Sequence, residues 1–210
     1  MADRLAYAIT YAVNPLVMPV IALGMVAAWS PAPTGEVLLI TATAAVFFAV
    51  IPAAYLFHLS RIGRISSVEI RSRKQRIRPL FMGALLLVPG VVAVGAVAST
   101  TQMLMLGLAA TFVINALLVG IITVWWKISI HASAVAGVVA LVVGMIPFPF
   151  IHVDASTLAV VMSGSIAALA AVMWSRVRLD AHSRAEVAVG AIFGMLITWV
   201  ELYFITSLLP

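Results

Sequence analysis

The feature that most constrains the fold of this chain is a series of seven long apolar stretches. Each has about 20 residues, the length that an α-helix needs to cross a bilayer core about 30 Å thick. The stretches cover residues 5–29, 36–57, 79–98, 103–126, 131–151, 156–174 and 186–209. Backbone groups in hydrocarbon must be hydrogen-bonded within the protein, and the stretches lack the ten-residue alternation of barrel strands, so we expect helices.

Composition places the whole chain in the same class. Of its 210 residues, 64% are hydrophobic and 9% are charged, whereas a soluble domain has about 45–50% apolar residues. We therefore expect an all-α, polytopic membrane helix bundle of about seven transmembrane helices, forming a single domain over residues 1–210 in the lipid bilayer. The chain has no Cys, which excludes thiolate chemistry. Asn14-Pro15 interrupts the first stretch, which we interpret as a span and not as a removable signal peptide.

The distribution of charge predicts the orientation of this bundle. If the spans alternate, all 12 Lys and Arg residues lie on one side of the membrane. The other side has Glu36, His152 and Asp154, with Glu201 near that end of the last span. The positive-inside rule then places the basic side and the N-terminus in the cytoplasm and the C-terminus outside. The net charge of +5 is thus a topology signal, and no nucleic-acid partner is expected.

Three polar clusters fall on the basic side: residues 71–79 (RSRKQRIRP), 127–133 (KISIHAS) and 175–186 (SRVRLDAHSRAE). In the third cluster, His182 and Glu186 are four residues apart at the start of the last helix, so their side chains can meet. A carboxylate that binds one imidazole nitrogen fixes the tautomer and leaves the other nitrogen available as a base or nucleophile. The alternatives are a solvated surface pair, or a Glu that serves the helix dipole.

The same clusters contain groups suited to phosphate. Arg71, Arg78 and Arg176 carry planar guanidinium groups that match phosphate oxygens, and together with two His residues they imply a dianionic ligand. Ser129 precedes an apolar run. It is expected either to cap the fifth helix and expose its first N–H groups to an anion, or to act as a cap alone.

The three clusters resemble the motifs of the type 2 phosphatidic acid phosphatase superfamily, K-x6-R-P, P-S-G-H and S-R-x5-H-x3-D. The chain reads Arg71-x6-Arg78-Pro79, Ile128-Ser129-Ile130-His131 and Ser175-Arg176-x5-His182-x3-Glu186. The resemblance covers the motif loops and their helices, about residues 70–195. The chain departs from the motifs at Arg71, Ile128, Ile130 and Glu186, and two complete spans separate the first motif from the second.

The resemblance implies a superfamily-like helical core and a metal-independent phosphatase. Its substrate would be a lipid phosphate or diphosphate, such as a polyprenyl diphosphate or a phosphatidate-like lipid. His182 would attack phosphorus to form a phosphohistidine, Glu186 would orient it, and His131 would be the general acid. The phosphate oxygens would be held by Arg71, Arg78, Ser129 and Arg176.

The two imidazoles need different protonation states in such a mechanism. A nucleophilic His182 must be neutral and an acidic His131 must be protonated, so their environments should separate their pKa values. The neighbouring Glu186 carboxylate raises the pKa of His182. Its role in the mechanism would therefore be orientation.

We expect no cofactor and no metal. Three of the seven acidic residues are close in sequence to the motifs, namely Glu69, Asp180 and Glu186. These are few carboxylates for a Mg²⁺ site. A metal-dependent prenyltransferase would need clustered Asp pairs. The aspartates, which are Asp3, Asp154 and Asp180, are dispersed.

Three alternatives remain open from the sequence. Ile128 and Ile130 in the second motif suggest a non-hydrolytic lipid-phosphate binding or transport protein of the same fold. A phosphotransferase would pass the phosphoryl group to an alcohol. A helical membrane protein whose cations only set topology would have these arginines and histidines pointing in different directions. Nothing in the sequence selects the lipid tail or an oligomeric state.

Overall fold

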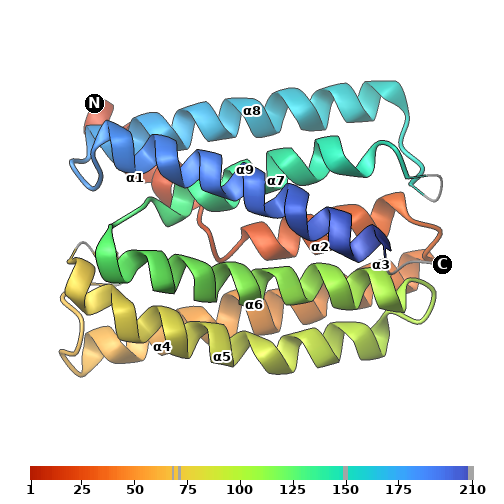
Figure 1. Cartoon of the computed structure of the whole chain (residues 1–210), viewed down its shortest axis with the longest axis horizontal. Coiled ribbons are helices and arrows are strands. Elements are labelled where there is room, and N and C mark those ends of the chain that lie inside the picture. The colour runs from red at the N-terminus through yellow and green to blue at the C-terminus, as the bar shows by residue number, and fades with distance from the viewer. Residues whose placement is uncertain (68, 71, 149–150, 208–210) are drawn as a thin grey trace.

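The computed structural model describes residues 1–67, 69–70, 72–148 and 151–207, and these residues form helices without any strand. Figure 1 shows the helices lying alongside one another in a single elongated bundle. In chain order they are α1 (Ala2–Ala12), α2 (Met18–Trp29), α3 (Thr34–Ala44), η1 (Ala45–Val50), α4 (Ile51–Arg61), α5 (Arg73–Val97), α6 (Gln102–Trp125), α7 (Ile130–Met145), α8 (Ala155–Arg178) and α9 (Arg184–Ser207).

Five helical segments of the described chain are long and apolar enough to cross a membrane. They are Thr34–Arg61, Arg73–Val97, Gln102–Trp125, Ala155–Arg178 and Arg184–Ser207. The first of them runs without a break from α3 through the π-helical turn η1 into α4. Helices α2 and α7 are apolar but shorter. The expected helical membrane bundle is therefore confirmed, whereas the count of seven spans stays a prediction.

The first apolar stretch forms two helices because the chain turns at Asn14-Pro15. The Asn14 side-chain oxygen accepts a hydrogen bond from the backbone N–H of Leu16 at 2.9 Å, and Pro15 has no N–H with which to continue α1. Helix α1 packs against α8 instead of continuing the line of α2. This turn brings the N-terminal residues to the end of α8.

Helices α7 and α9 approach each other closely through small residues. A Cβ atom added to Gly190 would lie 2.6 Å from the carbonyl oxygen of Ser129, and one added to Gly194 would meet the backbone of Ser133. The start of α7 is further tied to α9 because the N–H of Ser129 donates to the carbonyl oxygen of Glu186 at 3.1 Å. The glycines thus bring the second and third sequence clusters together.

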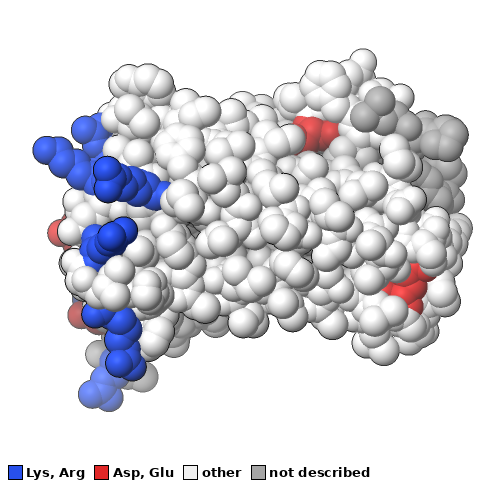
Figure 2. Space-filling model, turned by 90° about the horizontal axis from the view of Figure 1, so that it is seen from below, with Lys and Arg blue, Asp and Glu red and all other residues white. Residues whose placement is uncertain are grey.

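The motif loops meet at one end of the bundle, which we call the basic end. Figure 1 shows the N-terminus and the α4–α5, α6–α7 and α8–α9 connections there. Figure 2 shows Lys and Arg side chains gathered at this end of the visible face, with uncharged residues along the middle of the flank and acidic side chains toward the opposite end. The three clusters therefore lie at the same end of the structure, as the alternating spans require.

Candidate functional site

The turn between α8 and α9 positions His182. The N–H of Ala181 bonds to the carbonyl oxygen of Arg176 at 3.1 Å, and the N–H of Asp180 bonds to that of Val177 at 3.1 Å. These two bonds form a Schellman motif, and Asp180 takes the left-handed position with φ of 49°. The N–H of His182 also donates to the Arg176 carbonyl oxygen at 3.2 Å. These hydrogen bonds to the end of α8 fix the backbone conformation of His182.

Glu186 contacts both His182 and the start of α9. The Ser183 hydroxyl accepts from the N–H of Glu186 at 3.2 Å, and Glu186 Oε2 accepts from the N–H of Ser183 at 3.1 Å, which is a capping box. The same Oε2 lies 3.0 Å from Nδ1 of His182, whose side chain is 1% exposed. Glu186 therefore contacts the imidazole and also serves the start of the helix, whereas the burial of His182 contradicts the alternative of a solvated surface pair.

Arg76 is the guanidinium that faces His182. It stands in the first turn of α5 and is buried. Its Nε donates to the carbonyl oxygen of Ile70 at 2.5 Å, its Nη1 to that of Ile128 at 3.4 Å, and its Nη2 lies 3.3 Å from Nε2 of His182. Arg76 thus joins the first and third clusters and touches the backbone of the second.

These contacts define the tautomer of His182. A guanidinium has no acceptor, so Nε2 of His182 accepts the hydrogen bond from Arg76. The ring proton is then on Nδ1, where it is donated to Glu186. The lone pair on Nε2 is therefore engaged by the guanidinium group of Arg76.

A second buried guanidinium, that of Arg176, is 2% exposed at the end of α8. Its Nη1 donates to Oε1 of Glu69 at 2.9 Å and to the hydroxyl of Thr10 at 3.4 Å. Its Nε is buried and has no partner among the described residues. The sequence predicted no role in the site for Thr10 or Glu69, because no motif links these residues to Arg176, which is far away along the chain.

The arginines expected from the first motif are placed differently. Arg78 is exposed, and Arg71 lies outside the described residues. Successive helical residues are rotated by about 100°, so Arg78 points away when Arg76 points inward. The sequence did contain a signal for the burial of Arg76. Helical spacing places it on the same face of α5 as Pro79 and Leu87, which are also buried.

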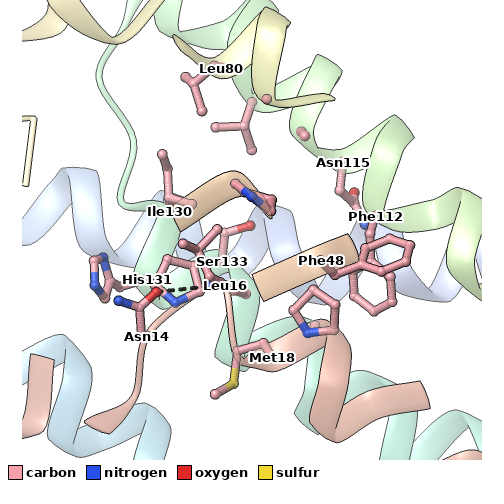
Figure 3. Close-up of a pocket in the computed structure, with 18 of the residues that line it drawn as sticks. Asn14, Leu16, Met18, Phe48, Leu80, Phe112, Asn115, Ile130, His131 and Ser133 are labelled. Atoms are coloured by element: carbon pink, nitrogen blue, oxygen red, sulfur yellow. Dashed lines mark hydrogen bonds between the residues drawn. The ribbon is translucent and has the colours of Figure 1, made fainter. Parts of the chain in front are cut away.

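Ser129 and His131 occupy the start of α7. The Ser129 hydroxyl accepts from the N–H of Ala132 at 3.4 Å, which confirms the predicted cap, while its contact with phosphate stays a prediction. His131 is half-buried. Figure 3 shows its ring next to Asn14, on one side of a cavity whose other side carries Phe48 and Phe112.

This cavity has a volume of about 800 Å³ and lies within the bundle. Its polar end is lined by Glu69, Arg76, His131 and Arg176. Apolar side chains from several helices line the rest, among them Phe48, Leu87, Leu108, Phe112 and Leu141. Arg76 lines the cavity and His182 does not, so the guanidinium covers the imidazole. The charged groups therefore form one end of an otherwise largely apolar chamber.

The electrostatics of the site keep His182 neutral. Burial lowers the pKa of His182 well below its ordinary value, and the positive charges of Arg76, Lys127 and Arg176 act in the same direction. The opposing effect expected from Glu186 does not dominate. Nε2 therefore keeps its lone pair at neutral pH.

In the part of the chain that the structure describes, no group of three or more His, Asp or Glu side chains is arranged to hold a metal ion. Comparison with protein-family models, with curated proteins and with solved structures finds no match.

The first prediction concerns acid stability. Between the lowered pKa of folded His182 and the ordinary value of about 6.5, only the unfolded chain binds a proton at this residue. Above about pH 6.5 His182 is neutral in both states, so the free energy of unfolding does not change with pH through this residue. Below that pH the free energy of unfolding falls by about 1.4 kcal/mol per pH unit. Denaturation of detergent-solubilised protein at about pH 7.5 and about pH 5.5 measures this loss. His182→Gln should show a correspondingly smaller loss, and an equal loss in both proteins would contradict the assignment.

Proposed function

We propose that this protein is a metal-independent phosphatase that hydrolyses a lipid phosphate or diphosphate through a phosphohistidine at His182. The observation that carries the proposal is the buried pairing of His182 with Glu186 on one ring nitrogen and with Arg76 on the other. The resemblance of the three clusters to the type 2 phosphatidic acid phosphatase superfamily supports the same chemistry. It also supports a core of that type, and the seven apolar stretches of the sequence support seven membrane crossings.

Binding of substrate would place the phosphate among the buried cations. Arg76 and Arg176 lie at the polar end of the cavity, and each has donors that suit phosphate oxygens. Ser129 is a further expected contact at the start of α7. A phosphate that takes the Nη2 donor of Arg76 frees Nε2 of His182 for reaction. Ligand binding thereby exposes the nucleophile that Arg76 covers.

The first chemical step forms a bond between Nε2 of His182 and phosphorus while the bond from phosphorus to the leaving oxygen breaks. His131 lines the cavity near the cations. Burial, Arg176 and Arg76 disfavour a positive charge on it, as they do on His182, so the expected difference between the two imidazoles is not found in the ligand-free site. A bound phosphate dianion would offset these cations and allow His131 to hold the proton that it gives to the leaving oxygen. Arg76 and Arg176 would stabilise the charge on the equatorial oxygens. Glu186 holds the proton on Nδ1, so the ring keeps its orientation throughout.

The second step transfers the phosphoryl group to water. The water oxygen bonds to phosphorus, the bond from phosphorus to Nε2 breaks, and the water proton returns to His131. Inorganic phosphate then leaves, and both imidazoles are in their starting states. An alcohol in place of water would give a phosphotransferase, and its product would be a new phosphate ester.

The second prediction tests this assignment by substitution. His182→Ala should lower phosphate release from a lipid phosphate by about 10³-fold or more, because the nucleophile is removed. Arg76→Ala should lower it by about 10²-fold or more, because charge on the transferring group loses a donor. Phosphate release by purified protein in mixed micelles, with and without EDTA, measures both effects.

Arg78→Ala is the matched control because Arg78 is on the same helix but exposed. It should retain activity within about threefold, as is usual for an exposed charge. Full activity in His182→Ala, or equal losses in the two arginine variants, would overturn the assignment. Binding of the lipid phosphate without any product would favour the non-hydrolytic alternative.

The third prediction concerns orientation. We propose that the basic end faces the cytoplasm, since Lys and Arg residues concentrate in cytoplasmic loops. With seven crossings, a tag at the C-terminus would be accessible from outside intact cells, and a tag at the N-terminus would not. Labelling with an impermeant reagent tests this, and a protected C-terminal tag would require an even number of crossings.

A further inference from the structure

A short segment of the α4–α5 connection supplies acceptors to both buried arginines. Oε1 of Glu69 accepts from Nη1 of Arg176 at 2.9 Å, and the carbonyl oxygen of the next residue, Ile70, accepts from Nε of Arg76 at 2.5 Å. The side chains of Arg176 and Glu69 are 2% and 18% exposed. Buried ion pairs are screened little by salt, so the Glu69 carboxylate is a strong counter-ion of Arg176.

The same segment borders the cavity where the cavity reaches the surface. Ser66, Ser67 and Glu69 line the cavity, and the two serines are exposed. Two residues of α1, Tyr7 and Tyr11, are also exposed and line it. The mouth of the cavity is therefore formed by α1 and the α4–α5 connection. An anion that enters through this mouth meets the Glu69 carboxylate at Arg176.

The backbone of the segment is anchored, whereas the carboxylate can leave. The Ser67 hydroxyl donates to the carbonyl oxygen of Glu69 at 2.8 Å, and Ile70 packs in a small cluster with Leu59. The Glu69 carboxylate makes one hydrogen bond within the described part of the chain, the one to Arg176. Rotation about the side-chain bonds of Glu69 breaks this contact without unfolding the connection.

A phosphate at the cationic end would compete with Glu69 for Arg176. Carboxylate and phosphate both bind a guanidinium through charge-assisted hydrogen bonds. Two anions beside one guanidinium repel each other, and the repulsion is strong where little water is present. Exchange of one anion for the other avoids this repulsion. It also leaves the buried Arg176 paired before and after binding, so no buried cation is left uncompensated.

We propose that Glu69 is an internal competitor for anions at the cationic end: phosphate binding displaces its carboxylate from Arg176, and its return expels inorganic phosphate after hydrolysis. The proposal rests on the proposed function for the position of the phosphate. It adds a residue for product release. The groups that hold the substrate phosphate, Arg76 and Arg176, hold the product phosphate equally well and do not provide that step.

Product inhibition tests the return of the carboxylate. In a lipid phosphate hydrolysis assay, inorganic phosphate should half-inhibit Glu69→Gln at about a tenfold lower concentration than the wild-type protein. The reason is that a neutral acceptor competes less well than a charged one for a guanidinium. Equal inhibition of the two proteins would overturn the role in product release.

Binding of inorganic phosphate tests the competition itself. Equilibrium dialysis of purified, metal-free protein in detergent against radiolabelled phosphate should show about tenfold tighter binding to Glu69→Gln than to the wild-type protein. Glu69→Asp keeps the charge but is one methylene shorter, so its carboxylate loses contact with Arg176. It should bind phosphate about threefold more tightly than the wild-type protein.

Asp3→Asn is the matched control for net charge. Asp3 lies at the same end of the bundle and pairs with Arg178 at 2.8 Å, but its side chain is 64% exposed. Because an exposed pair is weak, this variant should bind phosphate within about twofold of the wild-type protein. An equal gain in Asp3→Asn, or no gain in Glu69→Asp, would overturn the proposal, since the gain in Glu69→Gln would then come from charge and not from the contact.

The same measurement separates failure of this proposal from failure of the proposed function. Phosphate binding to the wild-type protein that is unchanged or weaker in Glu69→Gln would overturn the competition and leave the phosphate site in place. Absence of phosphate binding from the wild-type protein and from every variant would overturn both.

Discussion

The structure depends on how two guanidinium groups are accommodated at the end of an apolar helix bundle. Burying a charge costs several kcal/mol unless it is paired and hydrogen-bonded, so Arg76 and Arg176 constrain everything around them. Arg76 is satisfied by two backbone carbonyl oxygens and an imidazole. Arg176 is paired with Glu69, and its buried Nε has no partner within the described part of the chain. The described cluster contains more donors than acceptors. That imbalance is what a phosphate group, which offers only acceptors when fully ionised, would correct.

Local backbone chemistry explains how distant segments reach this cluster. The Schellman turn after α8 and the capping box of α9 fix His182 from both sides, while the glycine face of α9 allows the start of α7 to approach. The turn at Asn14-Pro15 redirects α1 so that Thr10 contacts Arg176. Each of these devices is formed by a few residues in sequence. Their combined effect is a polar site at one end of a chamber whose remaining walls are largely apolar.

Some of this was predictable from the sequence and some was not. The long apolar runs predict the helical membrane class because hydrocarbon leaves the backbone no other partner, and the four-residue spacing of His182 and Glu186 predicts their contact. The choice of Arg76 over Arg78 depends on which face of α5 is buried, which the motif spacing does not contain. The Glu69 and Thr10 contacts with Arg176 are made across more than 100 residues, so only the packing of helices creates them. The seven expected spans correspond to five long helices and two shorter ones, since hydropathy marks apolar runs and not where a helix breaks.

Binding of inorganic phosphate to the purified, metal-free protein tests the central claim most directly, because it requires the buried cations but neither a lipid tail nor turnover. Arg176 and Arg178 offer a matched pair on one helix, with side chains 2% and 49% exposed. The account predicts saturable binding to the wild-type protein, weakened about tenfold or more by Arg176→Gln and left nearly unchanged by Arg178→Gln. Absence of phosphate binding to the wild-type protein, or equal weakening by the two substitutions, would contradict it.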